Sequence, residues 1–248
     1  MKYYQTISAL KNQAKDKLTG KYANALWTLV LVSLITRAAT NTLTAFLPTG
    51  SWLWSIISLL MTAALSVFLG ALQTGIAYYF LNIACNMNYS SHNIFYGFQN
   101  KSERSFKVSL VHVLIECIYI LPFQILALLF IRTFEYKYII IAYAVMLLGT
   151  IIFAPLRLAL SQTYYLLLDF PDATAKEVLL TSMKIMKGHK WRLFKLELSF
   201  LPLQIVCLLS LGIGFLWLNP YMRMTQTLFF LDLMNPQSDV QSQNYAGF

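Results

Sequence analysis

The chain has 248 residues, of which 58% are hydrophobic and 12% are charged, with a mean hydropathy of +0.58 and a net charge of +9. Soluble domains carry about 25% charged residues, so this composition excludes an ordinary soluble protein and indicates an integral membrane protein. The positive charge requires no nucleic-acid partner, because it lies on segments that we expect at the cytoplasmic membrane surface.

Apolar segments in chain order predict an all-α protein with six transmembrane helices arranged as three hairpins. A spanning helix needs about 20 mostly apolar residues. The predicted spans cover about 22–47, 52–82, 108–131, 138–169, 194–211 and 215–234. Gly212 and Gly214 predict a tight turn between the last two. A second topology stays open, with five spans and a re-entrant final segment, because Pro220 and Arg223 interrupt the last helix.

The distribution of Lys and Arg predicts the orientation. With both termini in the cytoplasm, the inner segments hold five of them in 1–21, three in 83–107 and five in 169–192. The outer turns hold two, Arg132 and Lys137. Because basic residues on short loops stay cytoplasmic, we expect both termini inside the cell.

Nearly the same nine residues occur twice, as LPFQILALL at 121–129 and LPLQIVCLL at 201–209. Together with similar helix ends, they indicate three repeat units, about 1–84, 85–170 and 171–248, within a single membrane domain. Pro122 and Pro202 are expected to bend their helices by freeing the carbonyls of Ile118 and Leu198. Gln124 and Gln204 are expected to donate hydrogen bonds between helices.

Each unit is expected to begin with a cytoplasmic amphipathic segment. Ile7, Leu10, Ala14 and Leu18 share one helical face, and Thr174 with Glu177 forms a capping-box pattern ahead of a face with Leu179, Met183 and Met186. The second unit offers only Ile94, Phe95 and Phe98. Five lysines are expected to contact lipid headgroups: Lys11, Lys15, Lys184, Lys187 and Lys190. Residues 235–248 are expected to form a disordered tail.

Ionisable residues within the predicted spans form the candidate site. His112 and Glu116 are four residues apart on one helical face, and Arg157 lies at similar depth on the next helix. We expect an ion pair between Glu116 and Arg157 and a polar cluster of His112, Glu116, Gln124, Arg157 and Gln204. Such residues either hold the bundle together or line a ligand pathway. Glu197 and Arg223 are assigned to helix packing alone.

Motifs for catalysis, metals and cofactors are missing from the sequence. The three cysteines are isolated, and no HExxH, GxxxxGK[ST] or GxSxG pattern occurs. We therefore expect neither an enzyme nor a cofactor. The first apolar segment is too long for a signal peptide and is expected to be retained.

The stretch KIMKGHKWRLFKLELSF…LGIGFLWLNPYM…FFLDL, from Lys184 to Leu233, closely resembles a bacterial membrane-protein family catalogued as domain of unknown function 975. GIAYYFLN…NIFYGF, from Gly75 to Phe98, fits the same pattern. The resemblance implies a six-helix protein of the bacterial cytoplasmic membrane and carries over no catalytic residues. More distantly, the layout is similar to the membrane domain of some glycerophosphodiester phosphodiesterases.

Two functions therefore remain. The sequence favours the first, a non-enzymatic scaffold or binding module that engages lipid or a partner protein in the membrane or the cytoplasm, because the polar residues suffice to hold helices together and are too few to line a route. The alternative is a transporter or small channel for an amphiphilic or lipid-like compound. The sequence specifies neither the ligand nor the oligomeric state.

Overall fold

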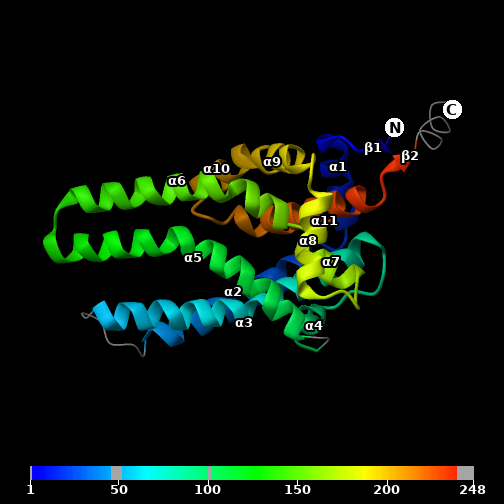
Figure 1. The fold of residues 1–248 in the computed structure, drawn as a ribbon. Coiled ribbons are helices and arrows are strands. Elements are labelled where there is room, and N and C mark those ends of the chain that lie inside the picture. The colour runs from blue at the N-terminus through cyan, green and yellow to red at the C-terminus, as the bar shows by residue number, and fades with distance from the viewer. Residues whose placement is uncertain (1, 46–51, 100–101, 239–248) are drawn as a thin grey trace.

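A computed structural model describes residues 2–45, 52–99 and 102–238 and shows an all-α protein (Figure 1). Two short strands, β1 (Lys2–Tyr3) and β2 (Gln237–Ser238), pair antiparallel and hold the two ends of the described chain together. The helices are α1 (Ile7–Leu18), α2 (Tyr22–Ala45), α3 (Trp52–Ala84), the 3₁₀ helix η1 (Ser91–Phe95), α4 (Tyr96–Gln99), α5 (Ser102–Thr133), α6 (Tyr136–Leu160), α7 (Thr163–Asp169), α8 (Ala175–Ile185), α9 (Lys190–Leu198), α10 (Leu201–Leu209) and α11 (Phe215–Met234).

Three helices are long and apolar enough to cross a membrane: Tyr22–Ala45, Leu53–Ala84 and Tyr136–Asp169. The two parts of α5, bent by 44° between Ile118 and Ile120, make a fourth if they count as one span. Three to four spans of the predicted six are therefore supported by length and composition. In the third hairpin, α9 and α10 have nine residues each, and α11 carries charges.

The molecule has two unlike regions (Figure 1). The α2–α3 and α5–α6 hairpins extend to one side, and their outer halves expose large apolar side chains such as Leu60, Ile140 and Leu147. The other end, which we call the packed end, contains α1, η1, α4, α7, α8 and most of α11. Its core includes Leu10, Tyr79, Phe80, Ile94, Met186 and Phe229. This division fits hairpins that face lipid and an end that buries its apolar residues within the protein.

The first amphipathic segment is confirmed. Thr6 caps α1, because its side chain accepts a hydrogen bond from the Ala9 backbone N–H. Leu10, Ala14 and Leu18 are all buried, and α1 packs against α11. The 3.6-residue period of a helix places these residues on one face, which explains why the pattern was readable from sequence.

In the third unit, the capping box is confirmed but the expected apolar face is offset. Thr174 and Glu177 form both hydrogen bonds of a capping box at the start of α8. The buried residues of α8 are Ala175, Val178 and Ser182, whereas Met183 is 42% exposed. The Ser182 hydroxyl donates to the Ala159 carbonyl at 2.7 Å. Ala175 and Val178 pack with residues of α5 and α7, and Ser182 faces α6. Of the expected face, Leu179 is partly buried and Met186 is fully buried, whereas Met183 faces outward.

Close backbone packing joins η1 and α4 to α3. A Cβ atom added to Gly75 would lie 1.9 Å from the Ile94 carbonyl oxygen, and one added to Gly97 would lie 2.2 Å from the Ala71 carbonyl oxygen. No side chain fits at either position, so both residues must be glycine for the second unit's short segment to lie here. Ile94 is fully buried and Phe95 is 36% exposed.

The two copies of the nonamer have different shapes. In α5, Pro122 follows a 44° bend at Ile118–Ile120, where the proline ring excludes the bond to the Ile118 carbonyl. In the third hairpin the chain breaks, because α9 ends at Leu198 and α10 begins at Leu201 with Pro202 in its first turn. Both expected distortions are confirmed. Pro220 lies buried within a continuous α11.

The turn between α10 and α11 is also as expected. Gly212 has a φ of +86°, and its N–H donates to the Cys207 carbonyl at 3.0 Å. A Cβ atom on Gly214 would lie 2.6 Å from the Cys207 sulfur. Gly212 adopts a left-handed conformation and Gly214 lies too close to Cys207 for a side chain, which together explain the Gly-Ile-Gly sequence.

The order of elements follows the three proposed units: α1 precedes the α2–α3 hairpin, η1 and α4 precede α5–α6, and α8 precedes α9–α11. The division of the chain into three repeat units stays a prediction. Of the expected tail 235–248, Gln237 and Ser238 form β2, and 239–248 lie outside the described residues.

Candidate functional site

A cavity of about 590 Å³ lies between the two long hairpins and the third unit. Its walls come from seven helices, α2, α3, α5, α6, α7, α9 and α11, together with the segment that joins α6 to α7. Four charged side chains line it: Glu116 from α5, Arg157 from α6, Glu197 from α9 and Arg223 from α11. The volume lies within the range of about 300–1,000 Å³ that is usual for small-molecule sites.

Three of the five residues in the expected polar cluster reach this cavity, namely His112, Glu116 and Arg157. The other two lie elsewhere. Gln124 is exposed, and its side chain forms no hydrogen bond within the described ranges. Gln204 donates from Nε2 to the Met222 sulfur at 3.6 Å, which joins α10 to α11. The functional role of these residues stays a prediction.

The expected ion pair between Glu116 and Arg157 does not form, since no salt bridge joins these two described residues. Both side chains are exposed at the cavity. Arg157 instead lies within electrostatic range of Glu197, although beyond the distance of a salt bridge. The charges that we expected to neutralise each other therefore remain available to whatever fills the cavity.

His112 is held by contacts on both sides of its ring. Its Nδ1 lies 3.0 Å from the Val108 carbonyl and its Nε2 lies 3.5 Å from the Thr163 hydroxyl. A carbonyl oxygen only accepts, so Nδ1 carries the proton in this arrangement. The ring stacks on Tyr164 at 5.3 Å, and the Tyr164 hydroxyl lies 3.3 Å from the Ser109 hydroxyl. These contacts fix the ring as part of the wall.

The expected cluster left out Glu197 and Arg223, which were assigned to helix packing, and Gln162, which the sequence did not single out. Arg223 donates from Nη2 to Gln73 Oε1 at 3.3 Å, which links α11 to α3 beside the cavity. Gln162 is 2% exposed, and its Oε1 has no hydrogen-bond partner in the described part of the chain. Arg223 and Gln226 both line the cavity and are three residues apart, a spacing that places them on one helical face. That polar spacing in the last predicted span was the available signal.

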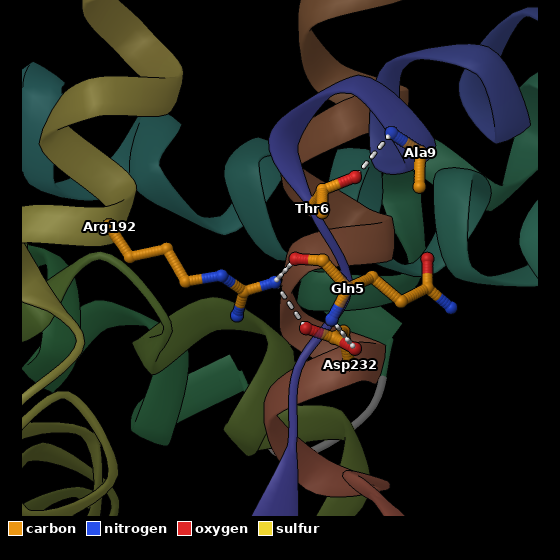
Figure 2. Close-up of polar contacts among 5 residues, drawn as sticks. All are labelled: Gln5, Thr6, Ala9, Arg192 and Asp232. Atoms are coloured by element: carbon orange, nitrogen blue, oxygen red, sulfur yellow. Dashed lines mark hydrogen bonds and ion pairs between the residues drawn. The ribbon is translucent and has the colours of Figure 1, made fainter. Parts of the chain in front are cut away.

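A second polar cluster, which we call the clasp, lies at the packed end (Figure 2). Arg192 at the start of α9 forms an ion pair with Asp232 near the end of α11, and their side chains are 18% and 3% exposed. Arg192 Nη2 also donates to the Gln5 carbonyl at 2.7 Å, and the Gln5 N–H donates to Asp232 Oδ1 at 3.1 Å. The guanidinium lies 4.8 Å from the Phe229 ring. The clasp thus fixes the N-terminal segment to two helices that line the cavity.

His189 lies beside the clasp, with its ring edge-on to Tyr4 at 4.5 Å. Burial, and then the nearby charge of Arg192, hold the pKa of His189 below its ordinary value, while Asp232 opposes them. The folded protein therefore favours neutral His189.

The five lysines expected at lipid headgroups differ in their surroundings. Lys15, Lys184 and Lys187 are exposed, and Lys190 is half-buried. Lys11 is engaged within the protein, because its Nζ donates to the Ser199 carbonyl at 2.9 Å and lies 4.1 Å from the centre of the Phe200 ring. Contact of the others with lipid stays a prediction.

Metal or disulfide chemistry finds no support in the residues that the structure describes. No cluster of three His, Cys, Asp or Glu side chains with metal-binding geometry occurs among them. Cys85 is exposed, Cys117 is partly buried and Cys207 is buried, and all three are free thiols.

Comparison with known proteins gives one match. The model of the family described as "Protein of unknown function (DUF975)" matches residues 1–237. The chain belongs to this family. No curated protein and no solved structure matches it. The stretches that resembled the family, 75–98 and 184–233, contain Gly75 and Gly97 of the α3 contact, both residues of the Arg192–Asp232 pair and two charges of the cavity.

Proposed function

We propose that this DUF975 protein binds an amphiphilic compound and moves it within or across a bacterial cytoplasmic membrane, with the polar part of the compound in the cavity. The observation that carries the proposal is a cavity lined by charges of both signs among helices whose outer faces are apolar. Ionisable residues within membrane spans face bundle interiors or water-filled cavities and mark ligand pathways. The proposal includes no catalytic step.

The clasp provides a comparison within the protein, because its two charges are in direct contact with each other. Arg192 and Asp232 are in direct contact, nearly buried and tied further to the Gln5 backbone. Glu116 and Arg157 differ on each count, because they are exposed at the cavity and form no salt bridge with each other. A pair that served only to fix helix order would gain from direct contact, so we favour a ligand role for the cavity charges.

The proposed topology has both termini in the cytoplasm. The β1–β2 pairing keeps the two ends of the described chain on one side, which requires an even number of crossings. The hairpins α2–α3 and α5–α6 supply four, and α9–α11 add either two, as predicted, or none if they form a re-entrant pair. The exposed lysines at the packed end support its placement at the inner surface.

The proposal is tested by identifying what the purified protein retains. We expect mass spectrometry of protein purified in a mild detergent to detect a co-purifying amphiphile at near-stoichiometric amounts. Glu116→Gln and Arg157→Gln are expected to lower its occupancy at least tenfold, because each removes a charge from the cavity. The matched controls are Glu135→Gln and Arg132→Gln at the exposed tip of the α5–α6 hairpin. Equal occupancy in all four variants would contradict the proposal.

One observation favours a second candidate, the lipid- or partner-binding scaffold. Helix α8 exposes Lys184 together with Leu180 and Met183, the last two at 47% and 42%. A basic helix with exposed apolar residues is suited to an anionic lipid surface or to a partner helix. This candidate predicts that Lys184→Glu and Lys187→Glu abolish binding to anionic lipid or to the partner, and that cavity substitutions leave that binding unchanged.

A further inference from the structure

The cavity presents charges of both signs from opposing helices. Arg157 and Arg223 provide two cations, and Glu116 and Glu197 provide two anions. No salt bridge joins any two of these four in the portion of the chain that is described. A ligand with a single sign of charge would meet repulsion from half of them. A zwitterion can satisfy both kinds, because its cation lies near carboxylates while its anion lies near guanidinium groups.

Gln162 adds a constraint on the cationic part of the ligand. Its Nε2 donates to the Ser161 hydroxyl at 2.8 Å, while its Oε1 is buried and has no donor. A buried acceptor without a donor is destabilising, so a donor from the cavity contents would be stabilising. Together with two carboxylates, this wall offers acceptors and favours a ligand that carries N–H groups.

The anionic part has a positioned partner in Arg223. The bond to Gln73 holds this guanidinium beside the cavity but uses only part of its donor capacity. A guanidinium has five N–H donors in a planar fork that suits carboxylate and phosphate. Arg157, which forms no salt bridge with any residue that the structure describes, supplies a second fork from α6.

Apolar side chains share the same walls. Leu69, Val113, Ile115, Ala154, Leu158 and Phe194 line the cavity beside the charged groups. The cavity therefore accommodates the start of a hydrocarbon chain next to a charged head.

We propose that the cavity recognises a zwitterion composed of a primary ammonium and a phosphate, the chemistry of an ethanolamine headgroup, in preference to its quaternary choline counterpart. This rests on the proposed function and names the ligand class of the same site. The primary ammonium donates to Glu116 and Gln162, and the phosphate accepts from Arg223 and Arg157. A quaternary ammonium has no N–H to donate and depends on aromatic faces instead, whereas Tyr164, Tyr165 and Phe194 at this site are each already stacked on another ring.

The test is a binding titration with three amphiphiles of identical chain length. Full-length protein, delipidated in a maltoside detergent, is titrated with lysophosphatidylethanolamine, lysophosphatidylcholine and lysophosphatidylglycerol. We expect the first to bind at least tenfold more tightly than the other two. Soluble phosphoethanolamine is then added as competitor. Displacement identifies the free zwitterion as a ligand, and no displacement identifies the lipid-linked headgroup; either result agrees with the proposal.

Two variants test the named contacts. Glu116→Gln and Gln162→Leu are expected to reduce the preference for ethanolamine over choline to less than twofold, without weakening the binding of lysophosphatidylglycerol. Glu116 is exposed, so its isosteric replacement keeps the test valid even if Gln162→Leu fails to fold. Glu135→Gln at the hairpin tip is the matched control and should keep the full preference.

The outcomes separate the two proposals. Equal affinity for the three amphiphiles, with loss of binding in Arg157→Gln, would overturn the ethanolamine assignment and leave the amphiphile-binding function in place. Binding of none of them, with no co-purifying amphiphile either, would overturn both.

Discussion

The two copies of the nonamer show how the same residues take different shapes in different surroundings. In α5, the copy at 121–129 continues a long helix through a 44° bend. In the third hairpin, the copy at 201–209 starts a new helix after a break. The surroundings differ just before the copy at 201–209, where Phe200 is 2% exposed and the Ser199 carbonyl accepts a hydrogen bond from Lys11. A proline frees a carbonyl in both cases, and tertiary contacts beside it decide between a bend and a break.

The largest expected effect comes from removing the Arg192–Asp232 contact, which ties α9, the helix before the break, to α11. Arg192→Ala leaves the buried Asp232 carboxylate without its partner, and uncompensated buried charges cost about 3–5 kcal/mol. We expect chemical unfolding in detergent to show a loss of about 3 kcal/mol. Lys137→Ala removes the Glu135–Lys137 pair at the hairpin tip, which is exposed on both sides, and should leave the unfolding midpoint unchanged. Equal effects of the two substitutions would refute the contrast between the clasp and the tip.

The prolines themselves provide the next test. Pro122→Ala should straighten α5, because it restores the N–H that can bond to the Ile118 carbonyl, and lengthen the separation between Lys107 and Arg132 by roughly 2–3 Å at 1.5 Å of rise per residue. Pro202→Ala should leave the break intact, because contacts from α1 maintain it. Spin labels on either side of each proline, measured by pulsed dipolar spectroscopy, distinguish these results. A straight α9–α10 in Pro202→Ala would assign the break to proline alone.

A smaller effect is expected at the contact from α1. Lys11→Met removes a charged donor from the Ser199 carbonyl, at a cost of about 1 kcal/mol for a partly exposed hydrogen bond. Lys15→Met, one helical turn later on the exposed surface, is the control. The same unfolding assay measures both, and a larger loss in the control would contradict the role of Lys11.

The smallest effect is a dependence on pH. Because the pKa of His189 is lowered in the folded protein, the unfolded chain binds a proton more readily, so stability is present above the ordinary value of about 6.5 and is lost as the pH falls below it. We expect the melting temperature to fall between pH 7.5 and pH 5. His189→Gln should show a smaller fall over the same range. An identical fall in the variant would assign the dependence to other groups.

Local features of the fold were predictable because they depend on neighbours in sequence. The first-unit helix, the capping box, the Gly212 turn and both proline distortions follow from periodicity and backbone chemistry. The six-span topology was not fully supported, since α9 and α10 are short and the composition of α11 is not that of a clear span. Length and hydropathy cannot separate a broken span from a re-entrant pair.

Contacts between distant segments were not predictable from one sequence. Arg192 and Asp232 are 40 residues apart, and Gln5 and Asp232 are 227 apart, with no periodic pattern that relates them. The same limit explains the cavity. Glu116 and Arg157 were placed at similar depth from helix geometry, but whether they touch depends on how α9 and α11 enter between the hairpins. The expected face of α8 was right in part, because Met186 is buried, but Met183 is exposed and the small residue Ser182 meets α6 instead.

The central claim, that the charged cavity is open to water and solutes within the membrane, can be tested by thiol labelling. The two variants are Val113→Cys, at the cavity, and Leu114→Cys, on the adjacent exposed face of α5, which we expect to contact lipid. Each is introduced after replacing Cys85, Cys117 and Cys207, reconstituted in vesicles and treated with a charged methanethiosulfonate reagent. The account predicts rapid labelling at 113 and none at 114. If the reagent labels neither position, the bundle is dry and the account is contradicted.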